Sequence, residues 1–265
     1  MRARKRFGQH FLLDRSVIDR IVATIDPQPG ERLVEIGPGL GAITIPLLER
    51  LNELDAIEID RDAIRELRAK TAQTTLQRTL RIHEADALRF DLRSLNAGPK
   101  ALRIIGNLPY NISTPLLFHL IEQIDVIRDM HFMLQKEVVD RIAAAPGDEA
   151  YGRLTVMLAP HVRAESLFDI APGAFRPPPK VHSTFFRLTP HIQPPFIINN
   201  QETYARVVSA AFTQRRKTLR NALKGLLTED DIRVVEVDPG LRAEVIAPMQ
   251  YAALAAQLDR HLAPG

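Results

Sequence analysis

Four consecutive residues, Asn107-Leu108-Pro109-Tyr110, combine groups that could act on a flat, hydrogen-bonding substrate. They follow the apolar run 102–106, whose aliphatic residues predict a buried strand, and the proline ends the strand because it has no N–H to donate. In an open α/β sheet, an amide and an aromatic ring beyond a strand's carboxyl end would meet a ligand. The alternative is an ordinary loop before a helix cap at Ser113-Thr114-Pro115.

A second ligand-binding pattern lies upstream, where glycines follow a strand predicted over 32–36. The segment Gly37-Pro38-Gly39-Leu40-Gly41 leads into an apolar-periodic helix expected over 42–51. Glycines at such a turn let the backbone approach a ligand and leave helix N–H groups available. The G-x-G-x-G spacing differs from the dinucleotide fingerprint, so it argues against NAD and for another cofactor that carries adenosine. A tight turn of purely structural origin is the alternative.

Carboxylates stand at the ends of the next two predicted strands. Glu58 belongs to the strand 54–59, about 20 residues after the glycines, where an acid can accept hydrogen bonds from ribose hydroxyls. Asp86 follows a strand around 80–83 and could accept from an adenine amine, although a loop acid or a helix N-cap would explain it equally well. The strand, the glycines and Glu58 together predict a site for an adenosine-bearing cofactor.

The elements that must position these residues alternate along the chain. Apolar periodicity predicts further helices over 14–25, 61–70, 115–123, 136–145 and 151–159, and strands over 130–134, 165–170 and 181–188. This alternation predicts an α/β fold with a doubly wound, mostly parallel sheet. The proline-rich segment 190–195 predicts a boundary. We therefore expect a catalytic domain with a basic N-terminal arm over 1–190 and a small all-helical domain over 196–265.

Composition narrows the classes of protein to consider. The 265 residues can form one large domain or two smaller ones, and the absence of cysteine excludes disulfides and thiolate metal sites. We expect no metal site. The basic N-terminus is not followed by an apolar signal region, and no run approaches membrane-spanning length, so we expect a cytoplasmic protein that does not contact membranes.

Two basic patches are candidates for contacts with an anionic partner. The net charge is only +3, so such a partner must be met by local clusters of charge. The first patch is Arg4, Lys5 and Arg6, and the second is Arg215, Arg216, Lys217 and Arg220. Their density suits phosphate contacts, although a solvated helix end would also explain the second patch.

The segment Phe175-Arg176-Pro177-Pro178-Pro179-Lys180 predicts a stiff loop, because proline cannot continue a strand ladder. Two interpretations of its aromatic residue stay open. The loop presents Phe175 at the rim of the predicted site, or it is a polyproline connector whose Phe175 is buried in the core.

In their order along the chain, these segments resemble the KsgA (RsmA) family of small-subunit rRNA adenine dimethyltransferases. The resemblance covers nearly the whole chain and rests on residues 7–12, 35–41, 58–60, 86–87, 107–113, 175–183 and 215–221. It implies S-adenosylmethionine as methyl donor and, as substrate, two adjacent adenosines near the 3′ end of 16S rRNA within an immature 30S particle. It also implies a cofactor site lined by His10, Leu12, Gly37, Gly39, Glu58, Asp86 and Asn107. One departure is His10, because some relatives carry asparagine there.

For this reaction, the resemblance implies that residues 107–110 bind the target adenine. The Asn107 side-chain oxygen and the Leu108 carbonyl would accept the N–H groups of its amine, and Pro109 would stiffen the turn. Tyr110 and Phe175 would stack on the two faces of the purine. The two basic patches would hold the surrounding RNA backbone, and we expect the protein to act as a monomer.

Three other functions compete with this hypothesis. An Erm-type methyltransferase acting on 23S rRNA would share the cofactor site and the chemistry. A ribosome-assembly factor could use the same fold mainly for binding. A nicotinamide dehydrogenase is disfavoured by the glycine spacing.

Overall fold

The computed structural model describes residues 10–51, 53–72, 79–109, 111–214 and 216–262. The chain forms two compact units, 1–139 with 164–190, and 140–163 with 191–265. The boundary expected at 190–195 does not account for residues 140–163, which pack with the C-terminal helices. The assignment of a catalytic domain to 1–190 and an RNA-contacting domain to 196–265 stays a prediction.

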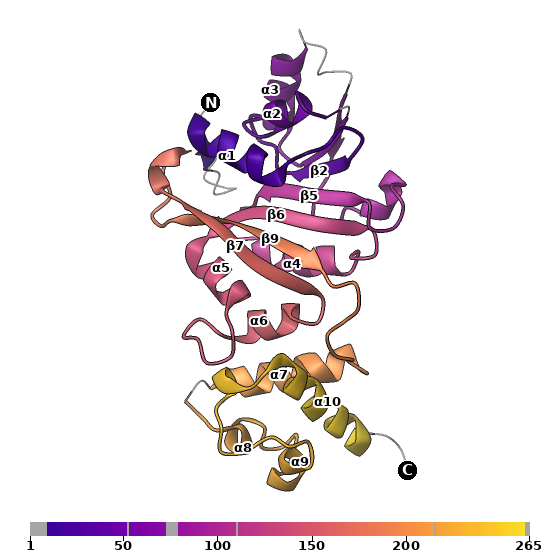
Figure 1. Cartoon of the computed structure of the whole chain (residues 1–265), viewed down its shortest axis with the longest axis vertical. Helices are drawn as coiled ribbons and strands as arrows, with labels where there is room; N and C mark the ends of the chain where they lie inside the picture. The colour runs from indigo at the N-terminus through magenta and orange to yellow at the C-terminus, as the bar shows by residue number, and fades with distance from the viewer. Residues whose placement is uncertain (1–9, 52, 73–78, 110, 215, 263–265) are drawn as a thin grey trace. The chain divides into compact units, whose positions relative to one another are not determined.

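A seven-stranded sheet, in the order β4-β3-β2-β5-β6-β9-β7, forms the centre of the first unit (Figure 1). Its strands are β2 (Arg32–Ile36), β3 (Leu54–Glu58), β4 (Leu80–Glu84), β5 (Leu102–Asn107), β6 (Ile127–Gln135), β7 (Val162–Ile170) and β9 (Ser183–Pro190). The five strands from β4 to β6 are parallel, and β9 runs antiparallel to β6. The predicted doubly wound, mostly parallel sheet is confirmed.

The helices of this unit are α1 (Arg15–Ile25), α2 (Thr44–Leu48), α3 (Arg61–Thr71) and α4 (Ser113–Ile121), and α5 (Lys136–Ala143) begins in it. Asp14 caps α1 by accepting from the backbone N–H of Ser16 at 2.9 Å. The helix α2 is shorter than the predicted 42–51. Gly41 has φ +82°, outside the helical region, so it belongs to the turn, and residues 41–43 form that turn before the helix begins at Thr44.

Both faces of the sheet are buried. Leu33, Ile105, Met133 and Phe185, from four different strands, share a core cluster with residues of α1 and α2. Their neighbours along the same strands, Val34, Ile104, Phe132 and Phe186, point to the opposite face and are also buried. Burial on both faces is what a parallel sheet requires, and it explains why these strands read as continuous apolar runs.

The chain reverses its direction of sheet growth at β2, which lies between β3 and β5. Ile36 at the end of β2 is paired with Ile57 on one side and with Gly106 on the other. A Cβ atom added to Gly106 would lie 2.6 Å from the Ile36 carbonyl oxygen, so only glycine allows β5 to lie this close. Ligands of open α/β sheets bind at such a switch point, beyond the carboxyl ends of the strands.

The second unit is built mainly from helices. They are α6 (Arg153–Leu158), α7 (Gln201–Thr213), α8 (Leu219–Ala222), α9 (Glu229–Val234) and α10 (Pro248–Leu262). Three buried tyrosines in its core donate to backbone carbonyls: Tyr151 to Ile246 at 2.7 Å, Tyr204 to Val156 at 2.9 Å and Tyr251 to Ala243 at 2.7 Å. These hydrogen bonds satisfy the only polar atom of each ring and join different segments of the unit, including α7 to α6.

Gly106→Ala tests the close approach of β5 to β2. The added methyl group would collide with the Ile36 carbonyl, and we expect a loss of about 1–3 kcal/mol in the free energy of unfolding, typical of overpacking. Gly173→Ala is the matched control, because a Cβ there meets no atom within 4 Å. Urea denaturation of both variants provides the measurement. Equal midpoints for the two variants would contradict the requirement for glycine at 106.

Candidate active site

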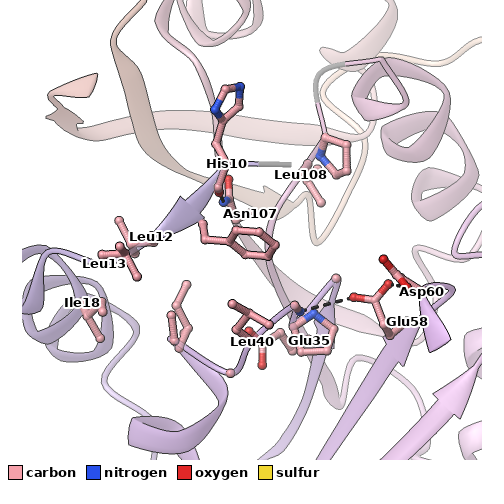
Figure 2. A pocket seen from close by; sticks show the side chains of 18 of the residues that line it. His10, Leu12, Leu13, Ile18, Glu35, Leu40, Glu58, Asp60, Asn107 and Leu108 are labelled. Atoms are coloured by element: carbon pink, nitrogen blue, oxygen red, sulfur yellow. Dashed lines mark hydrogen bonds between the residues drawn. The ribbon is translucent and has the colours of Figure 1, made fainter. Parts of the chain in front are cut away.

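A cavity of about 460 Å³ lies at the carboxyl ends of β2, β3 and β5. Its walls are the glycine turn after β2, the end of β3, the turn after β5 and the first described residues of the chain (Figure 2). Eight residues predicted for the site line it: His10, Leu12, Gly37, Gly39, Glu58, Asn107, Leu108 and Pro109. The volume is within the range of small-molecule and cofactor sites.

The glycine turn forms the floor of the cavity. Gly37 and Gly39 have φ +67° and +52°, values that side chains other than glycine rarely adopt. A Cβ atom on Gly37 would meet nothing within 4 Å, so the backbone here is open to a ligand. The ring of Phe11 lies 3.5 Å from the position of a Cβ on Gly39, and it therefore covers the turn from the other side.

Glu58 is held in the wall by backbone donors. Its carboxylate accepts from the N–H groups of Gly39 at 3.3 Å, Ile59 at 2.9 Å and Asp60 at 2.9 Å. Burial raises the pKa of this carboxyl, and the three donors oppose that rise. The bond to Gly39 ties β3 to the glycine turn, so Glu58 is preorganised to accept from a ligand (Figure 2).

Asp60, two residues after Glu58, also lies in the wall of the cavity. Its Oδ1 accepts from the N–H of Asp62 and caps α3, and its Oδ2 is buried without a hydrogen-bond partner among the described residues. A buried oxygen of this kind is costly unless a ligand or water donates to it. The acidic wall therefore fits a group with several hydroxyls, such as a ribose.

Asn107 has a defined orientation. Its Nδ2 donates to the carbonyl of His10 at 3.0 Å, which leaves the side-chain oxygen as the acceptor end of the amide. The next residue, Leu108, is fixed by its N–H donating to the Met133 carbonyl at 3.2 Å and by burial of its side chain. In the part of the chain that the structure describes, no donor reaches the Leu108 carbonyl.

A two-stranded sheet closes the same side of the cavity. The strand β1 (Phe11–Leu12) pairs antiparallel with β8 (Phe175–Arg176). His10 Nδ1 lies 2.7 Å from the Pro177 carbonyl oxygen, so His10 contacts the proline loop through its ring and Asn107 through its backbone. An asparagine at position 10 would preserve an N–H donor for the first contact.

Two predicted site residues lie differently from the expectation. Phe175 is only 4% exposed and packs in the core cluster with Phe185, so the structure favours the buried alternative over a ring presented at the rim. Asp86 does not line the cavity, and its Oδ1 accepts from the N–H of Leu88 at 3.0 Å, which agrees with the turn-capping alternative. Periodicity could not place the Phe175 ring, because its position depends on packing between distant segments.

Some of the predicted residues lie in the parts of the chain that the structure does not describe. Tyr110, Arg4, Lys5, Arg6 and Arg215 lie outside the described residues. Arg216, Lys217 and Arg220 are described and are exposed in the second unit. Their possible contacts with RNA stay predictions.

Glu35 is a site residue that sequence reasoning missed, although its place directly before the glycine turn was a signal. It lines the cavity, is 3% exposed, and its Oε2 has no hydrogen-bond partner among the described residues. Burial, reinforced by the nearby Glu58 carboxylate, raises the pKa of Glu35 to about 7. Other missed lining residues include the acidic Asp60, the polar Asn111, the basic Arg15 and Lys70, and apolar residues such as Phe11, Leu13 and Ile59.

Glu35→Gln should change how the stability of the unliganded protein depends on pH. Because the folded state raises the pKa of Glu35, the folded protein retains this proton while the unfolded chain releases it near pH 4.5. The contribution of Glu35 to the free energy of unfolding is fully present below that pH and is lost as the pH rises to about 7. The total loss is on the order of 3 kcal/mol. Thermal unfolding at several pH values should show a weaker decline for the glutamine variant. Parallel curves for variant and wild type would contradict the burial argument.

The described residues show neither of two other kinds of site. They contain no group of three or more histidine or acidic side chains that could hold a metal ion. None of the helices in those residues combines the length and hydropathy that a membrane span needs.

Comparison with known proteins places this site in context. The family model "Ribosomal RNA adenine dimethylase" matches residues 1–259. A protein of Methylococcus capsulatus named "Ribosomal RNA small subunit methyltransferase A" is 56% identical over 256 residues, covering 97% of this chain and 98% of that protein. A protein of the same name from Alcanivorax borkumensis is 52% identical over 254 residues, covering 96% and 89%.

Two solved structures share the fold. The 23S rRNA methyltransferase ErmE is 26% identical with a TM-score of 0.71, covering 94% of this chain and 99% of that one. A dimethyladenosine transferase from Plasmodium falciparum is 23% identical with a TM-score of 0.75, covering 95% and 98%. The match over residues 1–259, together with the cavity at the switch point, shows that this chain belongs to the ribosomal RNA adenine dimethylase family.

Proposed function

We propose that this protein transfers methyl groups from S-adenosylmethionine to the exocyclic N6 of two adjacent adenosines near the 3′ end of 16S rRNA. The observation that carries the proposal is the orientation of Asn107, which lines the cavity and whose amide nitrogen donates to the His10 carbonyl, so that its oxygen is left as an acceptor. The names of the bacterial relatives support the small-subunit RNA as substrate. Immature 30S particles are the proposed binding partner, and we propose that the protein acts as a cytoplasmic monomer.

The residues of the cavity fit the cofactor. Glu58 and Asp60 provide carboxylate oxygens at the end of β3 for the ribose hydroxyls, and Gly37 and Gly39 let the backbone approach the ligand. Glu58 and Asp60 place acidic groups beside the cavity, which favours a cation bound there, and a bound cation would in turn favour the ionised form of Glu35. When bound, S-adenosylmethionine supplies an electrophilic methyl group on a positively charged sulfur.

The turn after β5 would prepare the adenine amine for attack. The lone pair of this nitrogen is delocalised into the purine ring, so the amine is a weak nucleophile. If Asn107 Oδ1 and the Leu108 carbonyl each accept one N–H, the nitrogen is held pyramidal and its lone pair becomes available. Both acceptors are neutral and fixed before substrate binds, so positioning supplies most of the rate enhancement.

Proton removal needs no strong base in this scheme. Once the nitrogen forms a fourth bond, to the transferred methyl carbon, it is positively charged and strongly acidic, so one N–H proton leaves to water. After the first transfer only one N–H remains, so one of the two acceptors has no donor during the second transfer. The monomethylated amine must rotate before it can react again.

The target base must leave its stack to reach this turn, which costs a few kcal/mol and favours unpaired adenosines. We propose Tyr110 as the ring that stacks on the extruded base. Phe175 is buried, so it would not stack on the base. It would support the site only indirectly, through the pairing of β8 with β1. Arg216, Lys217 and Arg220 are exposed in the second unit and would contact RNA phosphates, as would Arg4, Lys5, Arg6 and Arg215.

Asn107→Ala should lower kcat for methyl transfer by roughly 10²- to 10³-fold, the loss typical of removing one positioned hydrogen-bonding group. We expect Asn107→Asp to lower kcat by a similar factor, because a carboxylate oxygen would replace the Nδ2 that donates to the His10 carbonyl. Both effects are measured with radiolabelled cofactor and immature 30S particles.

Particle binding provides the control for these two variants. We expect it to stay near the wild-type level, because Asn107 contributes only to the last step of positioning. A parallel loss of binding and of transfer would count against the role assigned to Asn107. Near-normal transfer by Asn107→Asp would show that the observed amide orientation is not needed.

Arg216→Ala combined with Lys217→Ala tests the C-terminal patch. Two lost phosphate contacts should weaken particle binding and reduce the slope of log K against log salt by about 1.4. Filter binding between 50 and 300 mM salt, on the order of physiological ionic strength, provides the slope. An unchanged slope would remove this patch from the RNA footprint.

A second candidate function is methylation of 23S rRNA, which the similarity to ErmE favours. Mapping of the labelled bases separates the two, because small-subunit and large-subunit RNA are modified at different adenosines. Label only in 23S rRNA would overturn the first choice. A protein that binds particles without any transfer would instead be an assembly factor.

A further inference from the structure

At the carboxyl edge of the sheet, Asn107 lies between a group of buried acids and a basic connection. On the β2–β3 side the side chains are acidic and buried: Glu35, Glu58 and Asp60 are 3%, 7% and 4% exposed. On the β6–β9–β7 side the connection 171–182 contains an arginine, a lysine and a histidine but no acid, and all three are exposed. The first half suits a cationic cofactor, and the second suits an anion.

The connection 171–182 belongs to this edge because of the strand directions. The register of β6 places Met133 beside Asn107, so Lys136, directly after β6, lies at the same edge. Its N–H donates to the carbonyl of His182 at 2.9 Å, which fixes one end of the connection beside the turn after β5. The N–H of Leu13 donates to the Ala174 carbonyl at 2.9 Å and fixes the other end.

Arg176 is held close to the acceptor turn. It is paired with Phe11 in the β1–β8 sheet, and the residue beside it, Pro177, accepts from His10, whose own carbonyl accepts from Asn107. Phe175 points into the core and successive side chains of a strand alternate, so Arg176 points to solvent. Two hydrogen bonds, from His10 to Pro177 and from Asn107 to His10, therefore connect the backbone of this loop to the residue that we propose binds the target amine.

Arg176 and Lys180 are available for an external anion. Among the described residues neither has an ion-pair partner, whereas Lys136 is 3.3 Å from Asp169, whose other oxygen accepts from Thr184. Three prolines at 177–179 lie between the two cations and restrict the backbone. Because the loop is already ordered, little conformational entropy is lost when the two side chains bind.

We propose that Arg176 and Lys180 form a phosphate-binding surface for the nucleotides that flank the target adenosine. This inference rests on the proposed function. A base whose amine lies at Asn107 is separated from its own phosphates only by a sugar, so those phosphates must lie near the rim. The surface would orient the extruded base, independently of the phosphate contacts made by the N-terminal arm and the C-terminal patch.

The test is the double variant Arg176→Ala with Lys180→Ala. We expect KM for immature 30S particles to rise by about tenfold for each lost contact, because hydrogen bonds to charged groups are strong. The slope of log K against log salt in filter binding should fall by about 1.4. The affinity for S-adenosylmethionine, measured by calorimetry, should stay at the wild-type value, which also shows that the variant is folded.

The matched control is Arg50→Ala with Lys100→Ala. It removes one exposed arginine and one exposed lysine from the connections that lead into β3 and β5, at the opposite edge of the sheet. We expect its KM and salt slope to match those of the wild type. Arg176→Lys with Lys180→Arg preserves both charges and should recover most of the affinity.

Two results would overturn the inference: a wild-type KM and slope for the Arg176/Lys180 variant, or an equal change in the control. Failure of the proposed function is seen separately, as wild-type protein that places no label in 16S rRNA adenosines. Filter binding remains readable in that case, so dependence of particle binding on Arg176 and Lys180 would still support the phosphate surface.

Discussion

The close approach of β5 to β2 is the constraint on which the rest of the site depends. Gly106 lies beside the Ile36 carbonyl where a Cβ atom would have no room, so the residues that follow the two strands emerge at the same level. One strand continues into the glycine turn and the other into Asn107 and Leu108. Methyl transfer requires donor and acceptor to be aligned at short range, and this pairing brings together the two segments that we propose bind them.

A second layer of contacts fixes the orientation of the acceptor. The amide of Asn107 has two chemically different ends, and the hydrogen bond to the His10 carbonyl determines which end faces the cavity. His10 is held in turn by the proline loop, through its ring and through the pairing of β1 with β8. The first described residues of the chain thus connect the cofactor cavity, the acceptor turn and the rim that we assign to RNA phosphates.

The distribution of charge separates two ligands of opposite sign. Buried carboxylates around the glycine turn cost desolvation energy, which appears as the raised pKa of Glu35 and of Glu58. A cationic ligand compensates that cost, and an RNA strand would be repelled by the same groups. Neutral acceptors at Asn107 and Leu108 stand between the two regions, where a carboxylate would disturb both.

The sequence by itself determined the alternation of elements, the doubly wound sheet, and the glycine turn and Glu58 as parts of the cavity wall. These features depend on local patterns: apolar periodicity, the glycine turn and an acid at a strand end at a fixed spacing. It did not determine that residues 140–163 pack with the C-terminal helices, that α2 begins only at Thr44, or that Glu35 faces the cavity. The tertiary structure also decided where the Phe175 ring lies, because the sequence around it, a phenylalanine beside prolines, is compatible with a position at the rim or in the core. Only the pairing of β8 with β1, between segments more than 150 residues apart, fixes that ring inside and leaves Arg176 outside.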